Sequence, residues 1–315
     1  MAPALHSAIS TRIKMHASLL GVQVAFASLS IVGKDALATF EPSELVFFRM
    51  LGAAAVLWVL HGVKLGSPLV PMRDAATIFA LSLLGMVANQ LLFLFGLERT
   101  TPVTATLLTC TIPVFALLIA VALRHEALRW RNVLGVGVAV LGVVLLLGTE
   151  GMSFGPSAVI GDAMILCNAA CYAAYLVLMR AMVLKHGHMK VMTLACTFGA
   201  VAIAPVCTPN LLQHSVHAGA RAWALVAFLV LVPTLFAYLL NAWALRRAPA
   251  SLVATYVYAQ PVAAMLFTFV LGREAPSAWS AFAAMVVLGG IAFATFADNA
   301  RPELACERNG VPRVP

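Results

Sequence analysis

The chain has 315 residues, of which 62% are hydrophobic and only 10% are charged, with a mean hydropathy of +0.97. Soluble domains carry roughly a quarter charged residues, so this chain has too few to cover a surface in contact with water, and we expect it to lie in a lipid bilayer. The net charge of +8 does not indicate nucleic acid, because the basic residues are scattered between apolar runs and form no cluster with aromatic residues.

Ten apolar stretches approach the length of about 20 residues that a helix needs to cross a bilayer. In chain order they cover residues 16–37, 44–63, 75–97, 102–123, 131–148, 157–180, 190–208, 222–245, 250–272 and 278–297. The sequence therefore predicts an all-α membrane protein with ten transmembrane helices in two sets of five. We expect a cytoplasmic segment (1–15), a first repeat (16–148), a turn-prone linker (149–156), a second repeat (157–297) and a cytoplasmic tail (298–315).

The basic residues orient these spans. If the N-terminus is cytoplasmic, 15 of the 20 Lys and Arg residues lie in inside segments and four lie outside, while Arg49 falls within a span. Cytoplasmic loops are rich in Lys and Arg, so this split predicts that both termini are cytoplasmic in a multi-pass protein of the inner (plasma) membrane.

The second set of spans repeats the first. A shift of 148 residues superposes several features that apolar composition does not produce by chance, namely Pro113 on Pro261, Val114 on Val262, Glu126 on Glu274 and Gly142 on Gly290. Because each set holds an odd number of spans, the two halves are predicted to cross the membrane in opposite orientations. Such inverted repeats recur in secondary transporters.

These motifs resemble a known family. The pattern is a Pro-Val pair within a span, then an apolar run ending in Glu, then a helix with a late Gly, and it occurs in both halves. It is similar to the paired EamA domains of the drug/metabolite transporter superfamily, whose usual arginine in the second span is matched by Arg49. The resemblance implies a transporter of small metabolites; members export amino acids, and others carry sugars, vitamins or cofactor-like solutes.

Polar side chains inside a bilayer are costly and tend to face the interior of the bundle. Here they are concentrated in spans one, three, four, six, eight and nine, so we predict a central substrate cavity lined by amides, hydroxyls and tyrosine rings. Its candidate residues are Gln23, Ser30, Asn89, Gln90, Thr109, Asn168, Tyr172, Tyr175, Tyr238, Asn241, Tyr256 and Gln260. Each of these residues taken alone is better explained by ordinary packing between membrane helices, and it is their clustering on repeat-related helices that favours a cavity.

A second group of residues is predicted to have gating or structural roles: Arg49, Pro113, Glu126, Pro261 and Glu274. For Arg49 three interpretations stay open, which are attraction of a substrate carboxylate, extension toward the membrane surface, and pairing with Glu41, Glu44 or a neighbouring helix. We favour a structural role. The prolines each remove a backbone donor, which is tolerated where a helix lines a cavity.

No metal site and no cofactor are expected. Cys167 and Cys171 are four residues apart but have no His or carboxylate beside them, so they are interpreted as packing residues. The sequence contains no phosphate-binding loop of the ATPase type and no zinc-protease or serine-hydrolase motif. An intramembrane enzyme is therefore the disfavoured alternative to a transporter.

The span interiors contain no Asp, Glu or His, which argues against a proton-driven exporter of cations. We expect a secondary transporter or facilitator of a small neutral or zwitterionic metabolite, exporting an amino acid or related metabolite by alternating access. The alternative is uptake of a vitamin-like or cofactor-like aromatic solute, for example a riboflavin-like one. The expected partners are the solute and the lipid bilayer, with no nucleic acid, in a monomer or homodimer.

Overall fold

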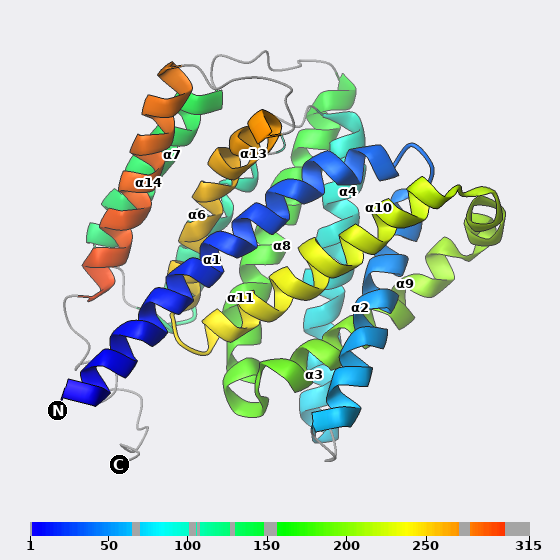
Figure 1. Cartoon of the computed structure of the whole chain (residues 1–315), viewed down its shortest axis with the longest axis horizontal. Helices are drawn as coiled ribbons and strands as arrows, with labels where there is room; N and C mark the ends of the chain where they lie inside the picture. Colours follow the sequence, from blue (N-terminus) through cyan, green and yellow to red (C-terminus); the bar gives the residue numbers. More distant parts are fainter. Residues whose placement is uncertain are drawn as a thin grey trace.

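The computed structural model describes residues 2–64, 70–100, 105, 108–126, 130–147, 156–270 and 278–299, and every regular element in these ranges is helical. The first half contains α1 (Ala2–Ala36), α2 (Pro42–Lys64), α3 (Met72–Ser82), η1 (Leu83–Ala88), α4 (Asn89–Arg99), α6 (Ile112–Ala122) and α7 (Trp130–Leu147). The second half contains α8 (Pro156–His186), α9 (His188–His217), α10 (Ala220–Val230), η2 (Leu231–Phe236), α11 (Ala237–Leu245), α12 (Ala250–Thr255), η3 (Tyr256–Tyr258), α13 (Ala259–Val270) and α14 (Ala278–Asn299). Figure 1 shows them as a bundle in which α1 crosses in front of α8.

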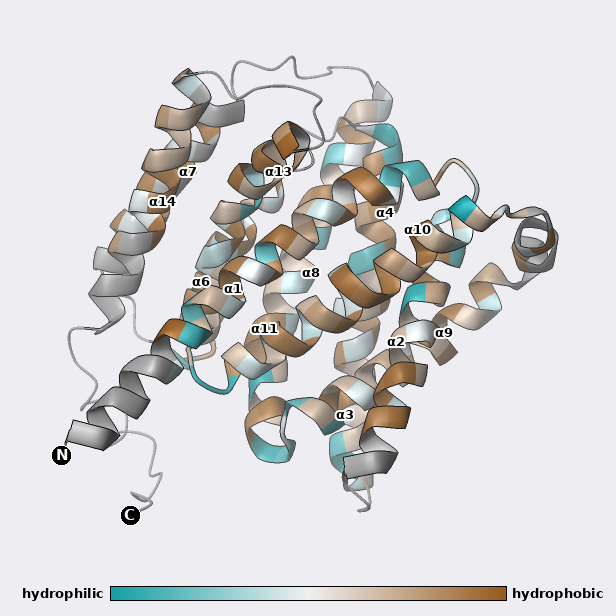
Figure 2. Cartoon of the chain, viewed as in Figure 1, coloured by the Kyte–Doolittle hydropathy of each residue, from teal (hydrophilic) through white to brown (hydrophobic). Residues whose placement is uncertain are grey.

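Most of the bundle is apolar on its outside as well as in its core (Figure 2). Within the described ranges, seven helical stretches are long and apolar enough to cross a membrane: Ile13–Ala36, Pro42–Leu60, Met72–Arg99, Ser157–His186, His188–Cys207, Ala220–Leu245 and Ala250–Phe267. Three shorter apolar helices, Ile112–Ala122, Val133–Gly142 and Ala281–Ile291, lie where the sequence predicts spans four, five and ten. An all-helical membrane protein is thus confirmed, whereas the number of ten spans stays a prediction.

The 148-residue shift recurs in the helix boundaries. The third span consists of α3, a π-helical turn η1 and α4, and the eighth span consists of α10, a π-helical turn η2 and α11. Each of α10, η2 and α11 begins 148 residues after its counterpart, as α14 does after α7. The two halves therefore repeat each other down to the position of an uncommon helical irregularity.

The π-helical turn η2 contains a proline, which its counterpart η1 lacks. Pro233 has no backbone N–H, so the carbonyl of Leu229 one turn earlier loses its usual helical donor. The hydroxyl of Thr234 donates to that carbonyl at 2.7 Å. Inside a bilayer no water is present to take this role, so a neighbouring side chain has to satisfy the carbonyl.

Both prolines of the repeated Pro-Val motif lie next to a break in their helix. Pro113 is the second residue of α6 and follows a turn at Cys110 and Thr111. Pro261 is the third residue of α13 and follows the 3-10 turn η3. Both interruptions have the same cause, because proline disfavours a helical conformation in the residue before it and removes a ladder donor. The full course of the predicted fourth span (102–123) stays a prediction, since residues 101–104 and 106–107 lie outside the described residues.

Helices α7 and α14 pack against each other along their length and form one edge of the bundle (Figure 1). Gly142 of α7 permits this close approach. A methyl group on Gly142 would lie 2.7 Å from the backbone nitrogen of Val287 in α14. Small residues at such crossings let membrane helices gain van der Waals contact without a hydrophobic driving force.

We predict that Gly142→Ala destabilises the protein by about 1–3 kcal/mol, because the methyl group meets backbone that cannot move aside and the helices must separate. The measurement is the melting temperature of purified protein in detergent. Gly137→Ala on the same helix is the control, since a methyl group there meets no atom within 4 Å. Equal melting temperatures for the two variants would contradict this account of the α7–α14 crossing.

Candidate functional site

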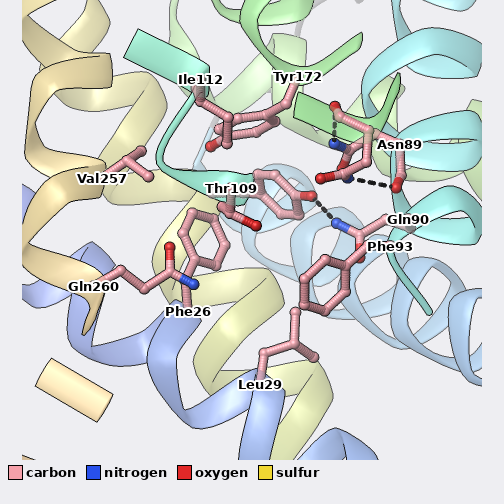
Figure 3. A pocket seen from close by; sticks show the side chains of 12 residues that line it. Phe26, Leu29, Asn89, Gln90, Phe93, Thr109, Ile112, Tyr172, Val257 and Gln260 are labelled. Atoms are coloured by element: carbon pink, nitrogen blue, oxygen red, sulfur yellow. Dashed lines mark hydrogen bonds between the residues drawn. The ribbon is translucent and has the colours of Figure 1, made fainter. Parts of the chain in front are cut away.

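A cavity lies within the bundle, and Figure 3 shows the side chains that line it. The lining residues are Phe26, Leu29, Asn89, Gln90, Phe93, Thr109, Ile112, Asn168, Tyr172, Tyr238, Val257 and Gln260. They come from the predicted spans one, three, four, six, eight and nine. The cavity volume is about 50 Å³ for water-sized spheres, which is room for a few water molecules.

Seven of the twelve predicted cavity residues lie on this wall: Asn89, Gln90, Thr109, Asn168, Tyr172, Tyr238 and Gln260. The structure therefore brings together amides, a hydroxyl and phenols from both halves of the chain. Their role as ligands of a solute stays a prediction.

The wall is built from repeat-equivalent positions. Three pairs of lining residues are separated by 148 positions in the chain, and in one pair the two side chains bond to each other. The pairs are Gln90 with Tyr238, Thr109 with Val257, and Ile112 with Gln260. Thr109 and Val257 each stand four residues before a proline, so each carbonyl lacks its usual helical donor. The cavity thus lies where the two halves meet and where both broken helices pass.

Asn89 of α4 and Asn168 of α8 form a reciprocal clamp. Asn168 Nδ2 donates to the Asn89 carbonyl at 2.7 Å, and Asn89 Nδ2 donates to the Asn168 carbonyl at 3.2 Å (Figure 3). The same two helices cross closely at Gly96 and Gly161, where an added methyl group on either would contact the other helix. The clamp therefore joins the two halves of the chain beside the cavity.

Arg49 of α2 lies behind the cavity wall and is 1% exposed. Its Nη1 donates to Gln90 Oε1 at 2.8 Å, and its Nε donates to Thr234 Oγ1 at 2.9 Å. Gln90 Nε2 in turn donates to the hydroxyl of Tyr238 at 2.5 Å. A buried guanidinium is thus connected to the cavity by a chain of hydrogen bonds.

The burial and hydrogen bonds of Arg49 distinguish among its three predicted interpretations. Arg49 does not reach the membrane surface, because it is buried. It makes no hydrogen bond or ion pair with Glu41 or Glu44. Its hydrogen bonds go to neighbouring helices, but the partners are neutral groups, and its Nη2 has no partner in the described part of the chain.

Tyr172 is held in place from behind the wall. Asn241 Nδ2 donates to its hydroxyl at 2.8 Å, and its ring stacks on that of Tyr175 with centroids 6.1 Å apart. Tyr175 itself packs against Gly85, where an added methyl group would overlap its ring, and its hydroxyl points at Met192 Sδ at 3.8 Å. The predicted cavity residues Asn241 and Tyr175 are therefore supports of Tyr172 and do not line the cavity.

The other predicted cavity residues lie elsewhere. Gln23 is buried on α1 beside the wall, and its Oε1 has no partner in the described part of the chain. The hydroxyl of Tyr256 bonds to Nδ1 of His16 at 2.5 Å, and Tyr256 is not among the lining residues. The side chain of Ser30 and all of Glu274 fall outside the described residues.

Two of the polar contacts that join the halves outside the cavity involve carboxylates near helix N-termini. Glu126, after α6, accepts hydrogen bonds from the backbone N–H and the hydroxyl of Ser251 in α12. Asp74 of α3 contacts both Lys185 Nζ and His186 Nε2 of α8 at 2.7 Å. Helix N-termini favour negative charge. Asp74 lies in the first turn of α3, and Glu126 contacts Ser251 in the first turn of α12.

Five apolar lining residues were not predicted: Phe26, Leu29, Phe93, Ile112 and Val257. An apolar side chain facing a cavity looks the same in the sequence as one facing lipid. The repeat carries a signal for two of them, because the 148-residue shift maps Thr109 onto Val257 and Gln260 onto Ile112.

Comparison with known proteins places this geometry in context. The EamA-like transporter family matches the sequence twice, over residues 14–148 and residues 159–296. An uncharacterized transporter of Archaeoglobus fulgidus is 28% identical over 288 residues, which is 90% of this chain and 97% of that protein. The aromatic amino acid exporter YddG of Ancylobacter novellus is 26% identical over 239 residues, covering 75% of this chain and 82% of its own length. A crystal structure of a protein 22% identical in sequence shares the fold, with a TM-score of 0.72 over 91% of this chain and 99% of that one.

We predict that Asn168→Ala lowers stability by roughly 1 kcal/mol, because it removes the donor that satisfies the Asn89 carbonyl between two helices. The melting temperature in detergent measures this effect. Gln260→Ala is the comparison, since Gln260 also lines the cavity but makes no hydrogen bond to the described residues. A larger loss of stability in the Gln260 variant would refute the clamp.

Proposed function

The chain belongs to the EamA-like transporter family, and we propose that it is a secondary transporter or facilitator of a small neutral or zwitterionic metabolite in the inner membrane. The solute we propose is an amino acid or related metabolite, and the direction is export. The observation that carries this proposal is the cavity wall. None of its twelve residues is acidic or basic, and they combine amides and hydroxyls with aromatic and aliphatic surface. Such a wall suits a solute without net charge that has an apolar part.

The proposed membrane arrangement has ten spans in two inverted halves, with both termini in the cytoplasm. Seven long spans and three shorter apolar helices supply the ten segments. The concentration of Lys and Arg in alternate loops supports the orientation. The repeated pattern of α3–η1–α4 in α10–η2–α11, together with five spans in each half, supports the inversion.

Alternating access follows from this arrangement. The broken helices before Pro113 and Pro261 meet the cavity at equivalent positions, so each half has one point where its helix can bend. When the two halves exchange conformations, the cavity opens to the other side of the membrane. The contacts of Glu126 with Ser251 and of Asp74 with α8 are the ones that such an exchange would have to break or form.

The rings around the cavity favour an amino acid with an aromatic or other apolar side chain. Phe26, Phe93, Tyr172 and Tyr238 are all on the wall, and one relative of this chain is named an aromatic amino acid exporter. The same rings keep a vitamin-like solute as the second candidate. The cavity volume favours the amino acid, because space for a few water molecules must widen much less for an amino acid than for a three-ring compound of the riboflavin kind.

We predict that Thr109→Val lowers amino-acid transport severalfold without loss of folded protein. The substitution keeps the shape of the side chain but removes a hydroxyl that lines the cavity. The measurement is counterflow of radiolabelled L-phenylalanine in proteoliposomes, compared with riboflavin.

Thr193→Val is the matched control. Both threonines are buried and both donate to the carbonyl four residues earlier, at 2.7 Å for Thr109 and 2.9 Å for Thr193, but Thr193 does not line the cavity. Wild-type transport of riboflavin and none of any amino acid would overturn the proposed solute.

A further inference from the structure

The hydrogen-bond directions behind the cavity follow from what each group is able to donate. Arginine only donates, so the bond from Arg49 Nη1 requires the carbonyl oxygen of Gln90 to face the arginine. The amide nitrogen of Gln90 then faces Tyr238 and donates to its hydroxyl oxygen. That hydroxyl keeps its own hydrogen for another acceptor, and the described residues offer none within hydrogen-bonding distance. Tyr238 therefore presents a donor at the cavity wall.

The hydroxyl of Tyr172, like that of Tyr238, is available as a hydrogen-bond donor. Its hydroxyl oxygen accepts from Asn241 Nδ2, so its hydrogen is also left for an acceptor in the cavity. The rings of Tyr172 and Tyr238 both meet the ring of Phe26 edge to face, with centroids 6.2 Å and 5.9 Å away. Two phenolic donors thus flank one apolar ring on the wall.

The two residues of the asparagine clamp present hydrogen-bond acceptors to the cavity. Asn89 and Asn168 each use their amide nitrogen on the other's backbone carbonyl, which leaves their side-chain oxygens as acceptors. Thr109 donates its hydroxyl hydrogen to the carbonyl of Ala105, so its oxygen also remains an acceptor. All three residues line the cavity. Among these residues, the two tyrosine hydroxyls form a group of donors, and the side-chain oxygens of Asn89, Asn168 and Thr109 form a group of acceptors.

The donor group has a positive charge behind it. Arg49 is buried, its Nη2 has no partner among the described residues, and its bonds go to the neutral groups of Gln90 and Thr234. A buried cation without a counter-charge is costly in a membrane, so a negative group nearby is favoured. Its charge also strengthens the donors at the end of the chain of bonds.

Building on the proposed function, we propose that the cavity binds an α-amino acid with its carboxylate on the hydroxyls of Tyr238 and Tyr172, where Arg49, acting through Gln90, is the positioning residue. The ammonium group lies at the oxygens of Asn89 and Asn168. The apolar side chain contacts the wall around Phe26, Leu29 and Phe93. Arg49 thereby selects the anionic end of the solute without touching it.

The test compares L-phenylalanine with L-phenylalaninamide, which differ only in the carboxylate, on full-length protein purified in detergent. The dissociation constant of each is measured by isothermal titration calorimetry. We expect wild-type protein to bind the acid at least about tenfold more tightly, since a charge-assisted hydrogen bond is stronger than a neutral one. In Arg49→Gln and in Tyr238→Phe this ratio falls toward one.

Tyr238→Phe keeps the test decisive if Arg49→Gln does not fold, because it removes the donor and leaves both bonds of Arg49 in place. Tyr258→Phe is the matched control. It removes a buried hydroxyl that has no partner in the part of the chain that the structure describes and does not line the cavity, so its ratio should equal that of wild type.

Equal binding of acid and amide by wild-type protein overturns the inference and leaves the proposed transport function standing. An unchanged ratio in Tyr238→Phe overturns it equally. If neither compound binds, the inference fails. If the counterflow assay in proteoliposomes then shows transport of riboflavin and not of L-phenylalanine, the proposed solute class fails as well. A loss of binding for both compounds in equal measure in Tyr238→Phe assigns a purely structural role to the hydroxyl and also overturns the inference.

Discussion

The bilayer offers no hydrogen-bond partner to a polar group, and the rest of this structure depends on that constraint. A proline in η2 leaves the carbonyl of Leu229 without a donor, and the hydroxyl of Thr234 satisfies it. The oxygen of that hydroxyl then accepts from Arg49, whose guanidinium also bonds to Gln90, which bonds to Tyr238. Most of these groups are satisfied by the next, although Nη2 of Arg49 has no partner among the described residues. The chain of bonds ends at the cavity, where a solute or water can supply a partner.

Duplication explains why the cavity lies where it does. Helices that are equivalent by the 148-residue shift pack on one another, α2 against α9 and α7 against α14, and the equivalent residues Gln90 and Tyr238 bond to each other. Equivalent breaks before Pro113 and Pro261 meet in the same region. Irregular backbone with unsatisfied carbonyls is tolerated in a membrane only where it faces a cavity, so the site and the breaks occur together.

The two halves have nevertheless diverged in the chemistry that they bring to the site. The first half contributes the buried charge of Arg49, and the corresponding region of α9 has no arginine. Gln90 is an amide that both accepts and donates, whereas its counterpart Tyr238 ends the chain with a hydroxyl. This asymmetry gives the wall a donor end and an acceptor end, which a symmetric duplicate would lack, and a polar wall of this kind suits a zwitterion.

The sequence by itself determined that the chain is helical and lies in a membrane, and it revealed the internal repeat and seven of the twelve lining residues. These properties are linear, since hydropathy, span length and a constant shift are readable along the chain. Only the tertiary structure decided that Asn241 and Tyr175 support Tyr172, that Tyr256 bonds to His16, and which neutral groups surround Arg49. These roles depend on how far each helix is rotated and how closely it approaches helices distant in the chain, as in the bond between His16 and Tyr256, 240 residues apart. Local periodicity carries no information about such contacts, because a polar stripe on one helix predicts that it faces protein and not which side chain it meets.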